Sequence, residues 1–180
     1  MAYFAVVLAR SEDGWDVNDV DLDEIDDLSD LADLMRDSAD EDSEGPFLLF
    51  LEQEDLWFAI VRVDGEDDPR VFVSDRAAVE HSAYAEMLLE AAGGEAALAG
   101  EDVDVLPDPD ADDDEPDGDD EPEGVVEASG PIGDHDVLAD LGTDADSLVE
   151  LCTKEGMLPS EVLTYLAEQA GAADALESVR

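Results

Sequence analysis

The first half of the chain alternates between short apolar runs and polar links. Trp15 and Val17 alternate with Asp16 and Asn18, and the apolar runs cover residues 3–8, 47–51, 56–63 and 71–73. Their length and their β-branched and aromatic residues are typical of strands. The last three follow one another across short links rich in Asp, Glu and Gly, which favours an antiparallel meander. We therefore expect a small, mostly antiparallel sheet of four to five strands.

One of these runs predicts a central position in the sheet. The segment LWFAIVRV, residues 56–63, is apolar on both of its alternating faces until Arg62. A strand with one solvated face alternates apolar and polar side chains, whereas a strand covered on both sides does not. We expect this strand to be covered on both faces for most of its length.

Two segments in the same half have helical periodicity. Residues 25–35 repeat apolar side chains at helical spacing, with acids on the opposite face, and Ser29 is a candidate N-cap. A second helix is predicted from a cap at Ser74 or Asp75 to about Glu90. Its apolar stripe consists of Val79, Ala83, Met87 and Leu88. With the strands, these helices predict an α+β domain over residues 1–92 that contains two helices.

The middle of the chain has a different composition. Residues 101–130 contain 15 acidic residues and no basic one, and include the run PDPDADDDEPDGDDEPEG. Such a segment has too few large apolar side chains to offset its chain entropy, and its like charges repel one another. We predict an acidic, Asp/Glu/Pro-rich disordered linker over residues 93–130.

Apolar periodicity returns in the last 50 residues. Short helical patterns follow one another, with Thr143 as a candidate cap, Pro159 as a candidate helix start and Gly171 as a stop. They predict three or four short helices, which is a small all-helical region over residues 131–180. A core this small is marginal when it stands alone.

Charge narrows the classes of partner. The chain has 54 acidic and 7 basic residues, for a net charge of −47, while 44% of its residues are hydrophobic, which is enough for a core. A polyanion repels both nucleic-acid phosphates and anionic membranes. We expect basic protein partners, cations or no partner at all, with no direct nucleic-acid or membrane binding. A single cysteine, no recognisable leader and no long apolar stretch favour a cytoplasmic protein.

No residue pattern predicts catalysis or cofactor binding. An EF-hand reading that starts at Asp113 fails, because Gly124 stands where the loop needs Glu. His81 and His135 lack companions at ligand spacing, and Cys152 lies on the apolar face of a predicted helix. Trp15 and Trp57 lie in predicted strands, where each is either a core aromatic residue or a partly exposed binding residue. We expect no catalytic, cofactor-binding or metal site.

Three parts of the sequence together resemble a known family. They are MAYFAVVLARSEDGWD, FLEQEDLWFAIVRVDGEDDPRVFVSDRAAVEHSAYAEMLL and GPIGDHDVLADLG followed by LVELC. With the acidic spacer, they are similar to the tRNA adenosine deaminase-associated proteins of actinobacteria. The resemblance implies an association with the enzyme that converts adenosine to inosine in tRNA. It implies no catalytic residues.

Three functional hypotheses remain from the sequence. The first is a non-catalytic accessory protein, associated with a tRNA adenosine deaminase or another basic protein. The second is an acidic mimic or antagonist that occupies a nucleic-acid site on a partner. The third is an enzyme that uses the sheet domain, and no constellation of residues supports it. A zinc deaminase is excluded, because the chain has one cysteine and no His-x-Glu pair.

Overall fold

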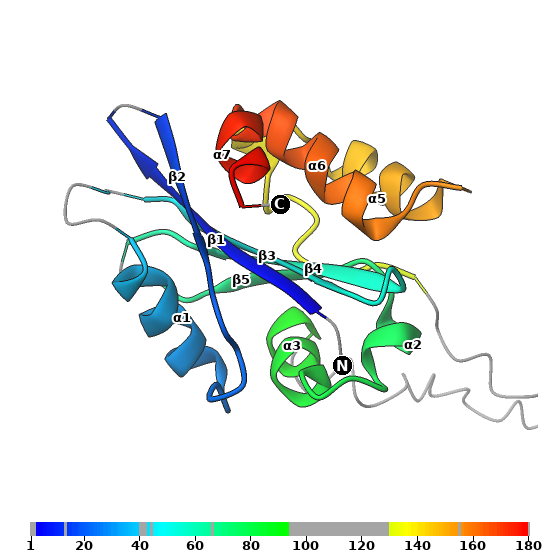
Figure 1. Cartoon of the computed structure of the whole chain (residues 1–180). Helices are drawn as coiled ribbons and strands as arrows, with labels where there is room; N and C mark the ends of the chain where they lie inside the picture. The colour runs from blue at the N-terminus through cyan, green and yellow to red at the C-terminus, as the bar shows by residue number, and fades with distance from the viewer. Residues whose placement is uncertain are drawn as a thin grey trace, which may run out of the picture.

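A computed structural model of the chain describes residues 3–12, 14–39, 43, 45–65, 67–93, 130–154 and 156–179. A single sheet lies between two layers of helices, one built from the N-terminal half of the chain and one from the C-terminal segment (Figure 1). The linker predicted at 93–130 lies outside the described residues except for its two ends.

The sheet has six strands in the order β2-β1-β3-β4-β5-β6, and every neighbouring pair is antiparallel. The strands are β1 (Tyr3–Ser11), β2 (Gly14–Asp19), β3 (Phe47–Gln53), β4 (Trp57–Val63), β5 (Arg70–Val73) and β6 (Ile132–Gly133). The predicted meander is β3-β4-β5 and is confirmed. The strand β4 is central and buried at all of its positions, as its two apolar faces predicted.

The strand register separates the side chains into two apolar faces. Val6, Phe50, Ile60 and Phe72 stand opposite one another across β1, β3, β4 and β5 and point to one face. Their sequence neighbours Val7, Leu49, Val61 and Val71 form the matching row on the other face. Because adjacent residues of a strand point in opposite directions, each face needs its own cover.

The first face is covered by α1 (Leu28–Asp37), α2 (Arg76–Val79) and α3 (Ala85–Gly93). Asp27 caps α1 by accepting a hydrogen bond from the amide of Asp30 at 2.9 Å, so the predicted cap at Ser29 is wrong. Asp75 caps α2 as predicted. The layer therefore has three helices where the sequence predicted two.

The predicted helix from residue 75 to 90 is interrupted after Val79. The Ser82 hydroxyl accepts a hydrogen bond from the Tyr84 amide at 3.1 Å, a local bond that competes with helical pairing. The interruption turns Ala83 outward to solvent, although its spacing placed it on the buried stripe. Val79, Met87 and Leu88 are buried as predicted.

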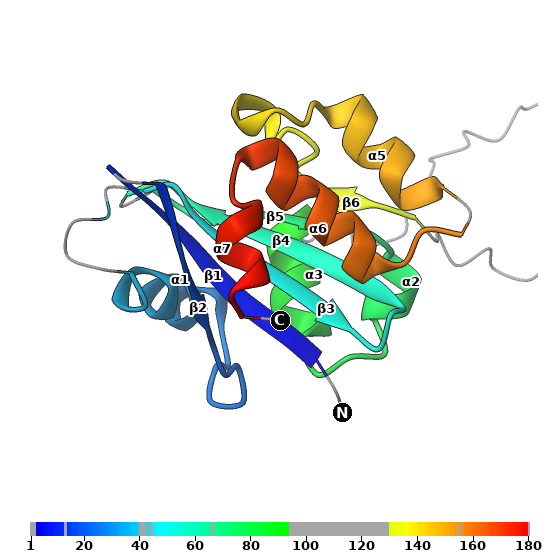
Figure 2. The same cartoon turned by 45° about the horizontal axis from the view of Figure 1, so that its top comes forward.

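The second face is covered by the C-terminal segment (Figure 2). It contains η1 (Ala139–Leu141), α5 (Ala145–Thr153), α6 (Pro159–Ala170) and α7 (Ala173–Glu177), in agreement with the predicted three or four helices. Pro159 begins α6 and Gly171 ends it with a positive φ of 77°, as predicted. Asp144, not Thr143, caps α5, and Thr143 is buried.

The sixth strand exceeds the predicted four to five. Ile132 and Gly133 pair with Val73 and Phe72 at the edge of the sheet. Gly133 has a positive φ of 104°, and a Cβ atom there would lie 2.1 Å from the carbonyl oxygen of Val71. Only glycine allows this close approach. A two-residue strand has no periodicity, so sequence patterns cannot reveal it.

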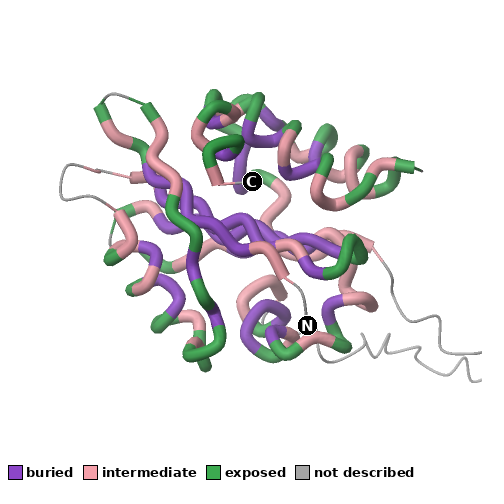
Figure 3. The backbone as a smooth tube through the Cα atoms, viewed as in Figure 1, coloured by how far each residue is buried: buried purple, intermediate pink, exposed green. Residues whose placement is uncertain are grey.

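The C-terminal helices and the sheet share one hydrophobic core. Seven sheet side chains cluster with the inner faces of η1, α5, α6 and α7; they are Val6, Leu8, Leu48, Phe50, Phe58, Ile60 and Phe72. Figure 3 shows the buried residues concentrated along the sheet between the two layers. The division into an α+β domain at 1–92 and a helical region at 131–180 stays a prediction, and the two segments share this core.

Candidate functional site

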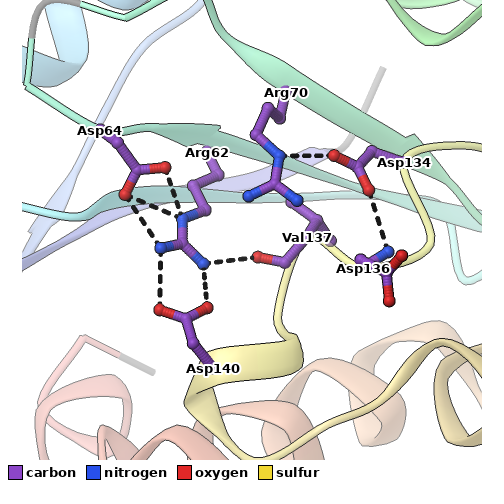
Figure 4. Close-up of polar contacts among 7 residues, drawn as sticks. All are labelled: Arg62, Asp64, Arg70, Asp134, Asp136, Val137 and Asp140. Atoms are coloured by element: carbon purple, nitrogen blue, oxygen red, sulfur yellow. Dashed lines mark hydrogen bonds and ion pairs between the residues drawn. The ribbon is translucent and has the colours of Figure 1, made fainter.

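The most connected polar group of the described residues is Arg62, on the central strand β4. The residue is only 6% exposed. Its guanidinium donates to both carboxylate oxygens of Asp64 at 2.8 to 3.0 Å. It also forms a two-pronged ion pair with Asp140 of η1 and donates to the carbonyl oxygen of Val137 at 3.0 Å. This cluster, which we call the Arg62 clamp, ties the C-terminal segment to the sheet (Figure 4).

A second ion pair lies beside the clamp. Arg70 on β5 donates through Nε to Asp134, which directly follows β6 (Figure 4). The other carboxylate oxygen of Asp134 accepts a hydrogen bond from the Asp136 amide at 2.9 Å. Arg62 and Arg70 therefore hold the same stretch, residues 134–140, at two points as it runs from β6 onto the second face of the sheet.

The two arginines lower the pKa values of carboxylates that they contact. The hydrogen bonds from Arg62 hold the pKa of Asp140 below its ordinary value, and those from Arg70 do the same for the pKa of Asp134. The two acidic partners in turn raise the pKa of Arg62, against the opposing effect of burial. These directions keep Asp134, Asp140 and Arg62 charged near neutral pH, so none of the three is poised to exchange a proton there.

The geometry indicates an anchoring role for the clamp. Every nitrogen of the Arg62 guanidinium already donates within the chain, to Asp64, Asp140 or Val137. Its donors are therefore directed at the chain's own oxygens and not at an open cleft. Bidentate Arg–carboxylate pairs add geometric specificity as well as energy, so the clamp fixes where the C-terminal layer sits.

A surface hollow of about 400 Å³ lies where the two layers meet the β3–β4 hairpin. Its floor is apolar and includes Phe58, Cys152 and Val162, and two carboxylates, Asp55 and Asp75, are part of its lining. Ser74 and Thr153 also contribute to its wall, so the hollow is lined by polar and apolar groups together.

Cys152 in this hollow is half-buried and packs against the C-terminal core, which agrees with its predicted place on the apolar face of a helix. Burial, with a smaller contribution from the negative charge of Asp75, raises the pKa of its thiol to about 12. The thiolate is the nucleophile of cysteine chemistry. A group with this pKa is therefore inert at neutral pH.

We expect Cys152 to react slowly with a thiol reagent such as 5,5′-dithiobis(2-nitrobenzoic acid) at pH 8. Relative to the guanidinium-unfolded chain, the rate should fall by about two to three orders of magnitude, because the thiolate fraction falls with the raised pKa. Asp75→Asn should recover only a small part of the rate, since burial is the larger cause. Native labelling within tenfold of the unfolded rate would contradict this assignment.

The other residues singled out in the sequence lie apart from one another. His81 is exposed on the first helical layer, with Nδ1 3.0 Å from the carbonyl oxygen of Ala77. The His135 ring packs edge-on against Phe72, with the ring centroids 5.5 Å apart, on the opposite side of the sheet. Trp57 is a core residue, whereas half-buried Trp15 donates its indole N–H to the Ala170 carbonyl at 2.9 Å.

The described parts of the chain contain neither a cluster of metal ligands nor a membrane-spanning helix. There, no group of three or more His, Cys, Asp or Glu side chains is arranged to hold a metal ion. No helix within those same ranges has the length and apolar character needed to cross a bilayer. The rejected EF-hand reading at Asp113 falls outside the described residues.

Comparison with protein families decides the relationship that the sequence motifs suggested. Residues 3–173 match the family described as Rv3753c-like tRNA adenosine deaminase-associated protein. The chain belongs to this family. No curated protein and no solved structure matches the chain. The family's description names an association with tRNA adenosine deaminase, and the match spans the sheet, the first helical layer and the C-terminal segment as far as the first residue of α7.

Membership in the tRNA adenosine deaminase-associated family does not make the chain a deaminase. A zinc deaminase needs one His and two Cys ligands, or three Cys ligands. Its catalytic Glu stands two residues after the His of the motif. The sequence has only Cys152, and Ala83 and Val137 stand two residues after its histidines. His81 and Cys152 also lie in different helical layers, on opposite sides of the sheet.

Proposed function

We propose that this protein is a non-catalytic, cytoplasmic accessory protein that binds a tRNA adenosine deaminase. The family match over residues 3–173 carries the proposal, because the family is described by its association with that enzyme. Direct contact is the simplest physical form of such an association. The protein would then act by occupying or organising a surface of the deaminase.

Charge supports a basic protein as the partner. An enzyme that binds tRNA needs a basic surface for the phosphates. The chain carries a net charge of −47, and complementary charges speed encounter between proteins. Most of the basic side chains in the described ranges already have ion-pair partners; they are Arg36, Arg62, Arg70 and Arg76. They leave little positive charge with which to bind RNA.

The polar clusters support a non-catalytic role. The Arg62 clamp and the Arg70–Asp134 pair use their donors and acceptors within the chain. Burial raises the pKa of the Cys152 thiol, which lowers the fraction of reactive thiolate at neutral pH. The strongest polar interactions on these residues are thus explained by packing of the C-terminal layer on the sheet.

A second candidate function has one specific observation in its favour. The segment that leads into and through α1 displays exposed acids on a folded surface; they are Asp21, Asp23, Glu24, Asp26, Asp27, Asp30, Asp33 and Asp37. Ordered carboxylates are what a mimic of nucleic-acid phosphates requires. In this alternative the protein occupies the tRNA site of its partner and acts as an antagonist.

Surface plasmon resonance with the purified tRNA adenosine deaminase of the same organism tests the proposal. We expect binding at low salt, with an association rate that falls steeply as salt rises, because screening weakens long-range attraction. Bare tRNA on a parallel channel should give no signal at physiological salt. Absence of binding to the deaminase at tens of micromolar protein in low salt would refute direct contact.

Competition with tRNA separates the two candidate functions. An accessory protein that binds outside the tRNA site leaves the affinity of the deaminase for tRNA largely unchanged. An acidic antagonist raises the apparent dissociation constant for tRNA in proportion to its own concentration. The result therefore assigns the function once binding has been observed.

A further inference from the structure

We propose that the outward face of α6, with the tip of the β3–β4 hairpin beside it, is the surface that docks the deaminase. This inference rests on the proposed function and adds to it the place of contact. The partner segment it fits has large apolar side chains flanked by Arg or Lys. We call this surface the α6 face; its residues are Asp55, Leu56, Leu151, Met157, Leu158, Glu161, Tyr165 and Glu168.

Exposed apolar side chains gather here. Among the described residues, the large hydrophobic side chains left exposed are Leu56 at 65%, Leu158 at 48% and Tyr165 at 39%. Leu56 is at the hairpin tip, and the other two belong to the start and middle of α6. Single exposed hydrophobics are ordinary on a protein surface, whereas a group of them on one surface region marks an interaction site.

The helix geometry aligns part of the group. Leu158, Glu161, Tyr165 and Glu168 follow one another at spacings of three, four and three residues, and all four are exposed. This spacing places them along one stripe of α6. Large apolar and acidic side chains therefore alternate down the outward face of the helix. The opposite face of α6 is buried in the core through Val162, Leu163 and Leu166.

Two hollows connect the stripe to its surroundings. The hollow of about 400 Å³ includes Leu56 and Leu158 in its lining, and a second of about 200 Å³ includes Tyr165. Leu151 and Met157 line both hollows, so the two are adjacent. The Ser160 hydroxyl also donates to Asp55 at 3.1 Å, which joins the hairpin tip to the first turn of α6.

Carboxylates around this surface define the chemistry of the partner. Asp55 and Asp75 line the larger hollow, Glu150 lines the smaller one, and Glu161 lies on the stripe between Leu158 and Tyr165. Lys154 is the opposing charge, at the smaller hollow. An apolar surface with an acidic rim complements apolar anchors beside basic side chains. A tRNA-binding enzyme carries such basic residues.

Charge disfavours a second copy of this chain as the occupant. Two copies meeting through the α6 face would bring like-charged rims together, and each copy carries a net charge of −47. Juxtaposed like charges oppose association. The acidic groove between α1 and α3, lined by Asp26, Asp27, Glu86 and Glu90, is a less suitable contact, because no large hydrophobic side chain there is exposed.

Three double variants of the full chain test the inference by surface plasmon resonance against the purified deaminase. Leu158→Ser with Tyr165→Ser removes the apolar anchors and should weaken binding at least about tenfold, mainly through faster dissociation. Glu161→Lys with Glu168→Lys should lower the association rate. The matched control, Glu86→Lys with Glu90→Lys, makes the same charge change on exposed positions of α3 and should alter the dissociation constant by less than about threefold.

The outcomes separate this inference from the proposed function. Thermal melting first establishes that each variant is folded, and light scattering establishes the oligomeric state. If the wild-type chain binds and both α6-face variants bind equally well, the inference is overturned and the proposed function stands. If the wild-type chain does not bind, the proposed function fails and its docking surface with it. A dimer that dissociates on Leu158→Ser with Tyr165→Ser would also overturn the inference, because it assigns the surface to self-association.

Discussion

Residues 1–92 expressed alone should not reach the native fold, and should form a collapsed or aggregating state without a cooperative thermal transition. The fragment contains five of the six strands and the whole first helical layer. It lacks everything that covers the second face of the sheet. The prediction of an independent domain over 1–92 came from counting elements, and the shared core leads us to expect the opposite result.

This expectation rests on the amount of apolar surface that the fragment would expose. Seven large or medium side chains of the sheet lose their cover, among them Phe50, Phe58 and Phe72, each no more than 1% exposed in the full chain. Leaving each one exposed costs about 1.5–3 kcal/mol, so the sum has an upper bound on the order of 10–20 kcal/mol. A domain has a total stability of only about 5–15 kcal/mol.

A cleavable form of the full chain is the matched control. A protease site placed within residues 101–127 lets the two halves be separated covalently after folding. We expect the cleaved halves to remain together in gel filtration and to melt in one transition, since they share the core around Phe72 and Leu166. A sharp melt and native near-UV circular dichroism for residues 1–92 alone would contradict the shared-core argument.

Sequence periodicity predicted most of the strands because each has enough residues to show it. The meander β3-β4-β5 was evident from three apolar runs and their short links. The two apolar faces of β4 also required cover on both sides. The N-terminal half offers helices for one face only, and the C-terminal helices had too small a core of their own. In the folded chain the C-terminal helices cover the second face of the sheet, and the sheet completes their core.

Neither segment alone reveals that the C-terminal helices cover the second face of the sheet. The strand β6 has two residues, and its Ile132 pairs with Val73 of β5, which lies 59 residues earlier in the chain. The break between α2 and α3 coincides with a local hydrogen bond from the Tyr84 amide to the Ser82 hydroxyl. Local side-chain bonds and long-range pairing leave no periodic signal, which is why both were missed.

The sequence contains part of the pattern that defines the Arg62 clamp and the α6 face. Arg62 is the first charge in an apolar strand, but its partners lie 2, 75 and 78 residues away, and the two distant contacts join the C-terminal segment to the sheet. The stripe of Leu158, Glu161 and Tyr165 has regular helical spacing. Periodicity alone does not reveal which stripe of a short helix faces the core and which faces solvent.

Replacing Arg62 with Met should destabilise the protein by about 2–3 kcal/mol, because the clamp loses its central cation while side-chain volume is nearly kept. The Val137 carbonyl loses a donor, and Asp140 loses its partner. The cost stays below that of a fully buried broken pair, since the side chains of Asp64 and Asp140 are 35% and 59% exposed and water can solvate them. Urea unfolding measures the change.

Asp140→Asn should cost less, about 1 kcal/mol, and its effect should depend on pH. Arg62 lowers the pKa of Asp140 in the folded state, so the unfolded chain binds more protons at acidic pH. The stabilisation is therefore complete above the unfolded pKa, near about 3.9, and is lost as pH falls through the lower folded pKa. The stability gap between wild type and Asp140→Asn should be constant from neutral pH to about pH 5 and close below about pH 4.

Asp33→Asn is the control that isolates the clamp from overall charge. It removes the same single charge from a chain of net charge −47, but from a surface ion pair with Arg36 in which Asp33 is 76% exposed. Exposed pairs contribute about 0–1 kcal/mol, and relief of repulsion among the acids opposes even that. Asp33→Asn should therefore be neutral or slightly stabilising at every pH. Equal losses for Asp33→Asn and Asp140→Asn would show that the ion pair between the layers adds nothing beyond an ordinary surface charge.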